Sequence, residues 1–311
     1  MSRYILKRVL LMIPILLGVT IIVFTIMSFT PGDPARLILG QSASQEAVDS
    51  LHREMGLDDP FLVRYFRYMG GIPRGDFGTS YRTNRPVFDE IFVRFPITAK
   101  LALVSMGLVI LIGIPLGILS AVKQYSFLDM LCTVSAMFMA SIPSFWLGLM
   151  MILLFSLHLG LLPPCGTGTL AHYVMPAIAL ALPIAAEVLR MTRSTMLETI
   201  RQDYIRTARS KGAAEKRVVW RHALKNALLP VVTVAGSEFG GLLGGTILIE
   251  SVFGIPGLGS LVVTSIRSKD VPQVMAATLF IALIFCVVLL VVDIAYAYID
   301  PRVKARYEKA R

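Results

Sequence analysis

Six long apolar runs constrain the fold of this chain more than any other feature of its sequence. The runs cover residues 9–29, 97–122, 128–157, 173–189, 227–249 and 274–299. A helix needs about 20 apolar residues to cross a hydrocarbon core of ~30 Å, which most of these runs supply. Lipid-exposed backbone must form its hydrogen bonds within the segment, which favours helices. The sequence therefore predicts an all-α polytopic membrane protein with six transmembrane helices.

Composition excludes two other classes. Of the 311 residues, 55% are hydrophobic and only 16% are charged, whereas soluble domains carry about 25% charged residues. A disordered chain or a water-soluble globule is therefore excluded. The first apolar run is also longer than the ~7–15 residues of a cleaved signal peptide, and a turn at 31–34 follows it instead of a cleavage site.

Lysine and arginine predict the orientation of the spans. One side of the membrane holds Arg3, Lys7, Arg8, Lys123, the strongly basic loop 190–226 and the basic residues after Pro301. On the other side, loop 158–172 has no lysine or arginine and loop 250–273 has two. The positive-inside rule then places both termini in the cytoplasm of a bacterial or archaeal inner membrane, with 300–311 as a cytoplasmic tail. Because the basic excess lies next to the membrane, it does not indicate a nucleic-acid partner.

Segment 30–96 is predicted to be an external segment between the first span, 1–29, and the remaining transmembrane domain, 97–299. It is polar and rich in turn residues, and it is expected to contain short helices such as 44–55 with Ser44 as the N-cap. Its suggested role is a lid or a docking surface over the external opening of a path between the spans.

Several residues inside the spans are candidates for a translocation path. Prolines bend helices, and the clearest break is expected at Ser141, Pro143 and Ser144, although helix packing also explains such kinks. Glu238 lies well inside the fifth span, and ionisable residues there are functional candidates. It could meet a peptide amino terminus or a metal ion, or belong to a structural polar network.

Glycines in the fifth span indicate close helix packing. They recur at spacings that include four residues, which lets another helix approach. The partner could be a helix of the same chain or a second membrane subunit. The candidate packing residues are Gly236, Gly240, Gly241 and Gly244.

Loop 190–226 is the most informative polar segment. Thr195 to Glu198 matches a capping box, which predicts that a helix starts there. One helical stripe then follows, made of Leu197, Ile200, Tyr204 and Ala208. Gly212 lies where a helix would end in the left-handed conformation. The loop is predicted to be a helix, a sharp turn and a second helix, and on periodicity alone an amphipathic hairpin on the lipid surface remains open.

Motifs along nearly the whole chain resemble one family. They are DYIRTARSKG at 203–212, HALKNALLP at 222–230, PGDP at 31–34, GLDDP at 56–60, GDFG at 75–78 and ESVFGIPGLG at 250–259. Taken in their order along the chain, they resemble motifs of the permease subunits of binding-protein-dependent ABC importers, specifically the first permease of the dipeptide/oligopeptide/nickel group. The resemblance implies the type I ABC importer permease fold.

The resemblance also implies a mechanism and partners. A homologous second permease, two ABC ATPase subunits and an external substrate-binding protein would complete the importer, with the loop helix inserted into a cleft of one ATPase. The implied coupling residues are Asp203, Tyr204, Arg206, Thr207, Ala208, Arg209, Lys211 and Gly212. The general loop pattern of the family is Glu-Ala-Ala, three residues, then Gly. Here Arg206 occupies the glutamate position, so the main polar contact to the ATPase is open.

No chemistry of its own is expected from this chain. It lacks a Gly-x-x-x-x-Gly-Lys-Ser/Thr phosphate loop, so ATP and Mg²⁺ would be bound by the partner ATPases and no catalytic residue, cofactor or metal site is expected. Peptides are the expected cargo, with nickel or metal chelates and glutathione-like solutes as alternatives. A stand-alone secondary transporter and an intramembrane enzyme are the competing classes.

Overall fold

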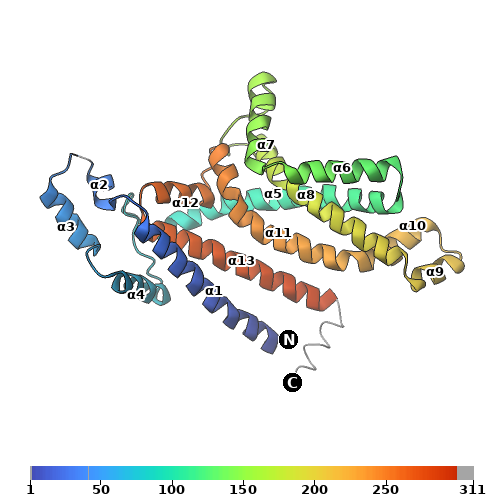
Figure 1. Ribbon diagram of the computed structural model, residues 1–311, viewed down its shortest axis with the longest axis horizontal. Coiled ribbons are helices and arrows are strands. Elements are labelled where there is room, and N and C mark those ends of the chain that lie inside the picture. Colours follow the sequence, from blue (N-terminus) through green and yellow to red (C-terminus); the bar gives the residue numbers. More distant parts are fainter. Residues whose placement is uncertain (1, 41, 300–311) are drawn as a thin grey trace. The chain divides into compact units, whose positions relative to one another are not determined.

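The computed structural model describes residues 2–40 and 42–299, and its regular elements in those ranges are helices (Figure 1). In chain order they are α1 (Ser2–Phe29), α2 (Pro34–Leu39), α3 (Gln45–Met55), α4 (Phe61–Gly71), η1 (Ile72–Arg74), α5 (Val87–Val122), α6 (Phe127–Ser141), α7 (Ser144–Met151), η2 (Ile152–His158), α8 (Ala171–Ile200), α9 (Asp203–Ser210), α10 (Glu215–Arg217), η3 (Val218–Ala223), α11 (Leu224–Val252), α12 (Leu258–Arg267) and α13 (Val271–Ile299). The tail predicted at 300–311 lies outside the described residues.

Within the described ranges, five helical stretches are long and apolar enough to cross a membrane, and a sixth candidate is a bent pair. The pair consists of Phe127–Ser141 and Ser144–His158, which meet at an angle of 96°. Ile142 between them is extended, with φ −88° and ψ 123°, as expected for the residue before a proline. The predicted break at Pro143 is therefore confirmed, and the third apolar run is not one straight helix.

The described chain divides into two compact units. The N-terminal unit comprises Arg8–Thr98 and Pro256–Ile284, and the central unit is built mainly from Ala99–Ile255. Helices α5 and α13 contribute residues to both.

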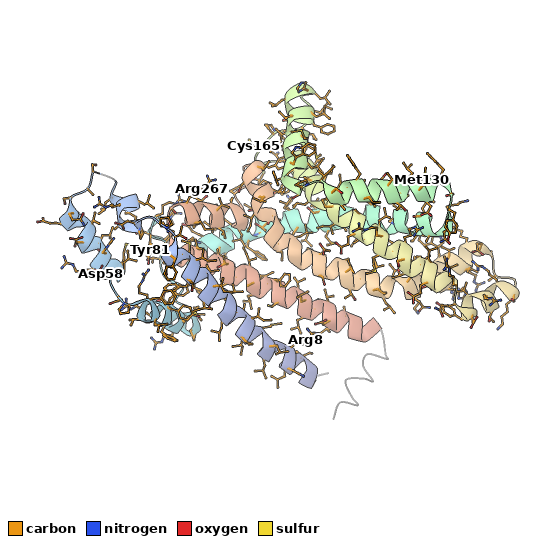
Figure 2. The ribbon with its side chains drawn as sticks, in the orientation of Figure 1. Arg8, Asp58, Tyr81, Met130, Cys165 and Arg267 are labelled. Atoms are coloured by element: carbon orange, nitrogen blue, oxygen red, sulfur yellow. The ribbon has the colours of Figure 1, made fainter. Side chains whose placement is uncertain are left out.

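Helix α8 is the most buried span of the central unit and packs against α6, α7 and α11 (Figure 1). Its buried face is rich in alanine, and small side chains let helices approach closely. Helix α5 approaches the same helix through Gly117, where an added Cβ would lie 2.7 Å from the Leu189 carbonyl oxygen. By contrast, α6 presents large apolar side chains such as Met130 on its outer face (Figure 2), as a lipid-facing helix does.

The N-terminal unit has its own core. Phe24 and Met27 of α1, Tyr65 of α4 and Met275 of α13 are buried together. Helix α3 begins as predicted, because the Ser44 side chain accepts a hydrogen bond from the Ala47 backbone N–H.

A buried carboxylate ties the loop before α5 to the start of α13. Asp270, 1% exposed, accepts hydrogen bonds from the Ser80 hydroxyl and from the backbone N–H groups of Tyr81 and Arg82. It also accepts one from the Gln273 N–H at the beginning of α13. Multiple donors stabilise a buried carboxylate, so this contact orders a loop that has no regular structure of its own.

Candidate functional site

Loop 190–226 forms a hairpin at the end of α8, but the hairpin begins later than the capping pattern predicted. Helix α8 continues without interruption to Ile200. The Thr195 hydroxyl donates a hydrogen bond to the Met191 carbonyl at 3.0 Å, as a mid-helix threonine does, and does not cap a new helix. The predicted start at Thr195 is therefore wrong. The change from apolar to polar residues near Arg190 does not end the helix.

The turn of the hairpin agrees with the prediction. Helix α9 ends at Ser210, and Gly212 has φ +77°, the left-handed conformation that glycine adopts without steric cost. Across the turn, Arg209 donates two hydrogen bonds to the Glu215 carboxylate, from Nε at 3.0 Å and from Nη2 at 2.6 Å. Paired donors on a carboxylate fix orientation as well as distance. Arg209 therefore holds the two limbs of the hairpin together.

One apolar residue anchors α9. Ile205 is fully buried in a cluster with Ile118, Ala121, Met196, Val218, Val219, Ala223 and Ala227. The expected stripe of Leu197, Ile200, Tyr204 and Ala208 is interrupted, because the chain leaves the helix at Arg201 and Gln202 and α9 starts in a new direction. Leu197 and Ile200 pack on the cluster. Sequence reasoning missed Ile205, the only strongly apolar residue of α9.

The other side of α9 remains open. Tyr204 is 44% exposed, and its hydroxyl accepts a hydrogen bond from Asn226 Nδ2 at 2.8 Å. Ala208 is half-buried, and the remaining proposed coupling residues Asp203, Arg206, Thr207, Lys211 and Gly212 are exposed. Beside them lies a pocket of about 520 Å³ whose polar lining includes Arg201, Arg206 and Gln124. The hairpin thus presents a basic, largely uncovered face.

An ion pair that the sequence did not predict joins α6 to α8 beside the base of the hairpin. Asp129 on α6 is 5% exposed and accepts hydrogen bonds from Arg193 Nε at 2.7 Å and Nη2 at 2.9 Å. It also accepts from the Ser120 hydroxyl at 2.5 Å and from the Tyr125 backbone N–H at 3.0 Å. Arg193 lies two turns before the end of α8. The signal in the sequence was Ser126 followed by an acid at position 129, in the first turn of an otherwise apolar helix.

The translocation-path candidates are not brought together. Ser141 and Pro143 are exposed and Ser144 is half-buried at the bend before α7. Helix α7 packs through Gly148 against Phe253 and Ile249, at the end of α11. Glu238 lies 11 residues before Ile249, about 16 Å along the helix. Its electrostatic neighbour is Glu187 on α8.

The four glycines of α11 serve two different faces. A side chain at Gly236 would collide with Val292, and a Cβ at Gly240 would lie 2.9 Å from Phe285 Cδ2, both on α13 of the same chain. Nothing lies within 4 Å of a Cβ built at Gly241 or Gly244. Packing within the chain therefore accounts for Gly236 and Gly240, while Gly241 and Gly244 line an open face.

No group of three or more metal-binding side chains occurs in the part of the chain that the structure describes. His158, Cys165 and His172, which stand seven residues apart, do not assemble into such a group. The His172 ring instead accepts a hydrogen bond from the Thr169 backbone N–H.

Two family models match the chain. Residues 113–305 match the model described as binding-protein-dependent transport system inner membrane component, and residues 1–102 match the N-terminal model of the same membrane components. The chain therefore belongs to the family of inner-membrane permease components of binding-protein-dependent ABC importers. It is a multi-pass transport subunit and not an enzyme. The importers of this family use ATP through separate ATPase subunits and receive cargo from a binding protein.

Curated relatives narrow the group to peptide and glutathione permeases. The dipeptide transport permease DppB of Alkalihalophilus pseudofirmus is 41% identical over 98% of this chain and 100% of its own length. The oligopeptide permease AppB of Bacillus subtilis is 42% identical with the same coverage. The glutathione permease GsiC of Salmonella paratyphi A is 42% identical over 98% of this chain and 99% of its own.

The fold also matches a solved importer. The inward-facing MetNI methionine ABC transporter aligns with a TM-score of 0.59 at 22% identity, covering 70% of this chain and 99% of that chain. At this identity the match shows the fold, which is that of an ABC importer permease.

Proposed function

We propose that this chain is one of two homologous permeases that form the translocation path of an importer for di- and oligopeptides. The observation that carries the proposal is the full-length identity of 41–42% to DppB and AppB. Two ATPase subunits would drive the cycle, and an external binding protein would deliver the peptide.

The basic hairpin is proposed to face the cytoplasm and to enter a cleft on one ATPase. Tyr204, Ala208 and the exposed Arg206 and Lys211 would contact that subunit. Arg209 has a different proposed role, because its guanidinium already binds Glu215 within the hairpin. Closure of the ATPase pair would then move α9, and Ile205 would pass the displacement to the helices that pack around it.

The Asp129–Arg193 pair is proposed to make this transmission stiff. It joins the start of α6 to α8 beside the hairpin, with four donors on one carboxylate. With this pair intact, the end of α8 and the α5–α6 corner would move together instead of sliding past one another.

The second permease is proposed to contact α11 at Gly241 and Gly244. These positions leave open space where another helix can approach closely. The path itself is proposed to pass Glu238 and Glu187, whose carboxylates would attract the amino terminus of a peptide. The bend before α7 is proposed to line another part of the translocation path, through Ser141, Pro143 and Ser144.

Glutathione import is the second candidate, because GsiC is as similar to this chain as the peptide permeases are. Transport in proteoliposomes distinguishes the two. The complete importer, with ATP enclosed and binding protein added, is expected to take up a labelled dipeptide, and uptake should stop without ATP or binding protein. Uptake of glutathione alone, or of Ni²⁺ alone, would contradict the peptide assignment.

A further inference from the structure

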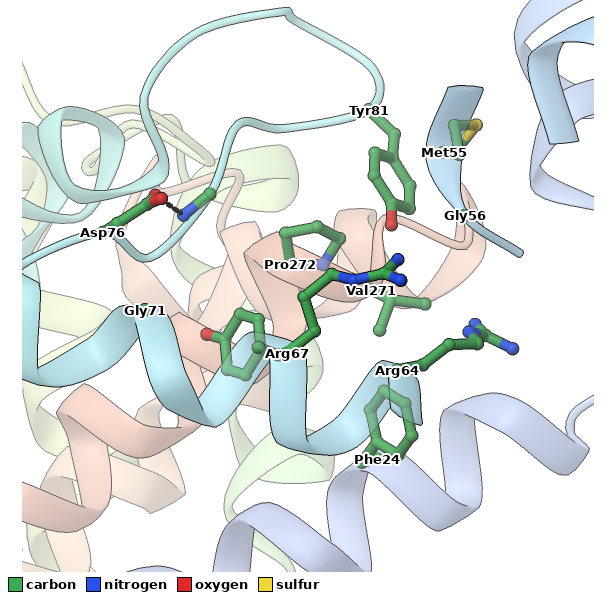
Figure 3. Close-up of a pocket in the computed structure, with 12 residues that line it drawn as sticks. Phe24, Met55, Gly56, Arg64, Arg67, Gly71, Asp76, Tyr81, Val271 and Pro272 are labelled. Atoms are coloured by element: carbon green, nitrogen blue, oxygen red, sulfur yellow. Dashed lines mark hydrogen bonds between the residues drawn. The ribbon is translucent and has the colours of Figure 1, made fainter. Parts of the chain in front are cut away.

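A pocket of about 210 Å³ with both polar and apolar lining residues lies in the N-terminal unit, between α4, the end of α3 and the loop before α5 (Figure 3). The start of α13 closes one side through Val271 and Pro272. None of the proposed transport roles uses this pocket. Its charged and hydroxyl-bearing lining residues are Arg64, Arg67, Tyr68, Asp76 and Tyr81.

Hydrogen-bond donors outnumber acceptors in this lining. Arg67 is compensated, because its Nη2 donates to Asp59 at 2.5 Å. Arg64 lies over the Phe24 ring, with Cζ 5.7 Å from the ring centroid. Within residues 2–40 and 42–299, no carboxylate forms an ion pair with Arg64. The pocket therefore contains one guanidinium whose charge is not neutralised by a contact.

The Tyr68 hydroxyl is a second donor that lacks an acceptor. It is buried and has no hydrogen-bond partner among the described residues. Burial raises the pKa of Tyr68, with the nearby Asp76 acting in the same direction, so the phenol stays protonated and able to donate. A buried donor without an acceptor is costly, and such a group in a native structure calls for an explanation. A ligand that supplies an acceptor oxygen provides one.

The single acidic lining residue is bonded within the chain through one of its two carboxylate oxygens. Asp76 is the only acidic residue that lines the pocket, and its Oδ1 accepts a hydrogen bond from the Gly78 backbone N–H at 2.9 Å. The remaining wall is apolar, formed by Phe24, Met55 and Val271. Unused donors and positive charge beside an apolar wall match an anion that carries an apolar group.

We propose that this pocket binds the carboxylate of a small organic ligand, with Arg64 and Tyr68 as donors and the Phe24 side as the apolar wall. Guanidinium groups match the planar geometry of a carboxylate. If the proposed function holds, the ligand is the free C-terminal carboxylate of a peptide whose last residue is apolar. This identity rests on the proposed function, whereas binding of a carboxylate does not.

The test measures binding without transport. The complex of both permeases and the ATPases, placed in nanodiscs of phosphatidylcholine without binding protein, is titrated with the dipeptide Ala-Phe and with its C-terminal amide. The amide should bind at least about tenfold more weakly, because it loses a charge-assisted contact. Arg64→Gln should weaken binding of Ala-Phe to a similar degree. Arg74→Gln is the matched control, since Arg74 is exposed in the same segment and does not line the pocket.

Tyr68→Phe separates binding from folding. Removing a hydroxyl that has no partner should leave the melting temperature of the complex unchanged or raise it, while binding of Ala-Phe falls. Equal affinity for the peptide and its amide, or equal effects of Arg64→Gln and Arg74→Gln, would overturn the proposal that this pocket binds a carboxylate. Ala-Phe binding could instead be lost in phosphatidylglycerol nanodiscs, with Arg64→Gln weakening the binding of that lipid to the pocket. The pocket would then be a site for a lipid phosphate, which would also overturn the proposal. Failure of peptide uptake with pocket binding intact would instead refute the peptide function.

Discussion

The hairpin around α9 and the segment between α1 and α5 are both polar excursions from apolar spans, but they are stabilised differently. The α9 hairpin is held by Ile205 and the buried Val218 and Val219 of its second limb, and by one exposed ion pair, Arg209–Glu215. The segment before α5 is held by helix caps, the core around Tyr65 and the fully buried Asp270. The hairpin keeps most of its polar face uncovered. The other segment satisfies most of its polar groups internally, with Arg64 and Tyr68 as the exceptions described above. Under the proposed function, an ATPase subunit completes the hairpin, whereas the other segment packs around a core of its own.

The largest effect on this contrast is expected from Asp129, which supports the hairpin from α6. Asp129→Ala leaves Arg193 without its carboxylate and should destabilise the permease by about 4 kcal/mol, since breaking a buried ion pair is costly. The melting temperature of the purified complex measures this loss. The double variant Asp129→Leu with Arg193→Met should recover much of the stability but not the uptake per ATP hydrolysed. Full recovery of that ratio would contradict a role in coupling.

A more local loss of stability is expected from Ile205→Ala, which removes most of the buried side chain that anchors α9. Large-to-small changes of fully buried aliphatic residues cost about 2–5 kcal/mol, and here the loss should appear as faster hydrogen exchange of 203–210. The neighbouring Tyr204→Ala provides the comparison, because Tyr204 is 44% exposed. It should leave hydrogen exchange nearly unchanged and reduce uptake. If Tyr204→Ala unfolds the hairpin and Ile205→Ala does not, the anchor has been assigned to the wrong residue.

Gly212→Val tests the turn of the hairpin. It should lower the free energy of unfolding by about 1–2 kcal/mol, because a β-branched residue is strained at φ +77°. The protein should still reach the membrane, but uptake should fall while ATP hydrolysis continues. Gly160→Val imposes the same kind of strain, at φ +62°, in a loop away from the hairpin. Normal uptake by the Gly212 variant, or an equal loss in both, would remove the coupling role of the turn.

The smallest effect concerns pH and the segment before α5. Burial alone would raise the pKa of Asp33, but the hydrogen bond with His52 and the Ala35 N–H outweigh it, so this pKa is lowered. A lowered pKa in the folded state stabilises above the unfolded value of 3.8, and this contribution is lost as pH falls through the folded pKa. Hydrogen exchange of α2 and α3, corrected for intrinsic rates, should therefore accelerate below about pH 4. Asp33→Asn should remove this step and Glu54→Gln should keep it; an unchanged profile in Asp33→Asn would exclude Asp33 as its source.

Much of the fold was predictable because lipid imposes one rule on every span. The apolar runs predicted the helices. Pro143 predicted the break, which the structure confirms as a bend of 96°. Local chemistry gave the Ser44 cap and the turn at Gly212. The start of the hairpin was mispredicted at Thr195. Helix α8 continues through this residue to Ile200, so the Thr195 hydroxyl bonds to a carbonyl of the preceding turn and caps no new helix. The Asp129–Arg193 pair joins residues 64 positions apart, and Ile205 packs in a cluster that includes the more distant Ile118. Periodicity does not register such contacts.

The most direct test of the account is a site-specific photocrosslink from the open face of the hairpin. A photoreactive amino acid replaces Lys211 in the complete importer, and mass spectrometry identifies what it captures after illumination. The same group at Phe138, which is 70% exposed on α6, is the matched control in a lipid-facing position. Position 211 is expected to capture an ATPase subunit, and position 138 is not. Capture of lipid alone at position 211, in a complex that still hydrolyses ATP, would contradict this expectation.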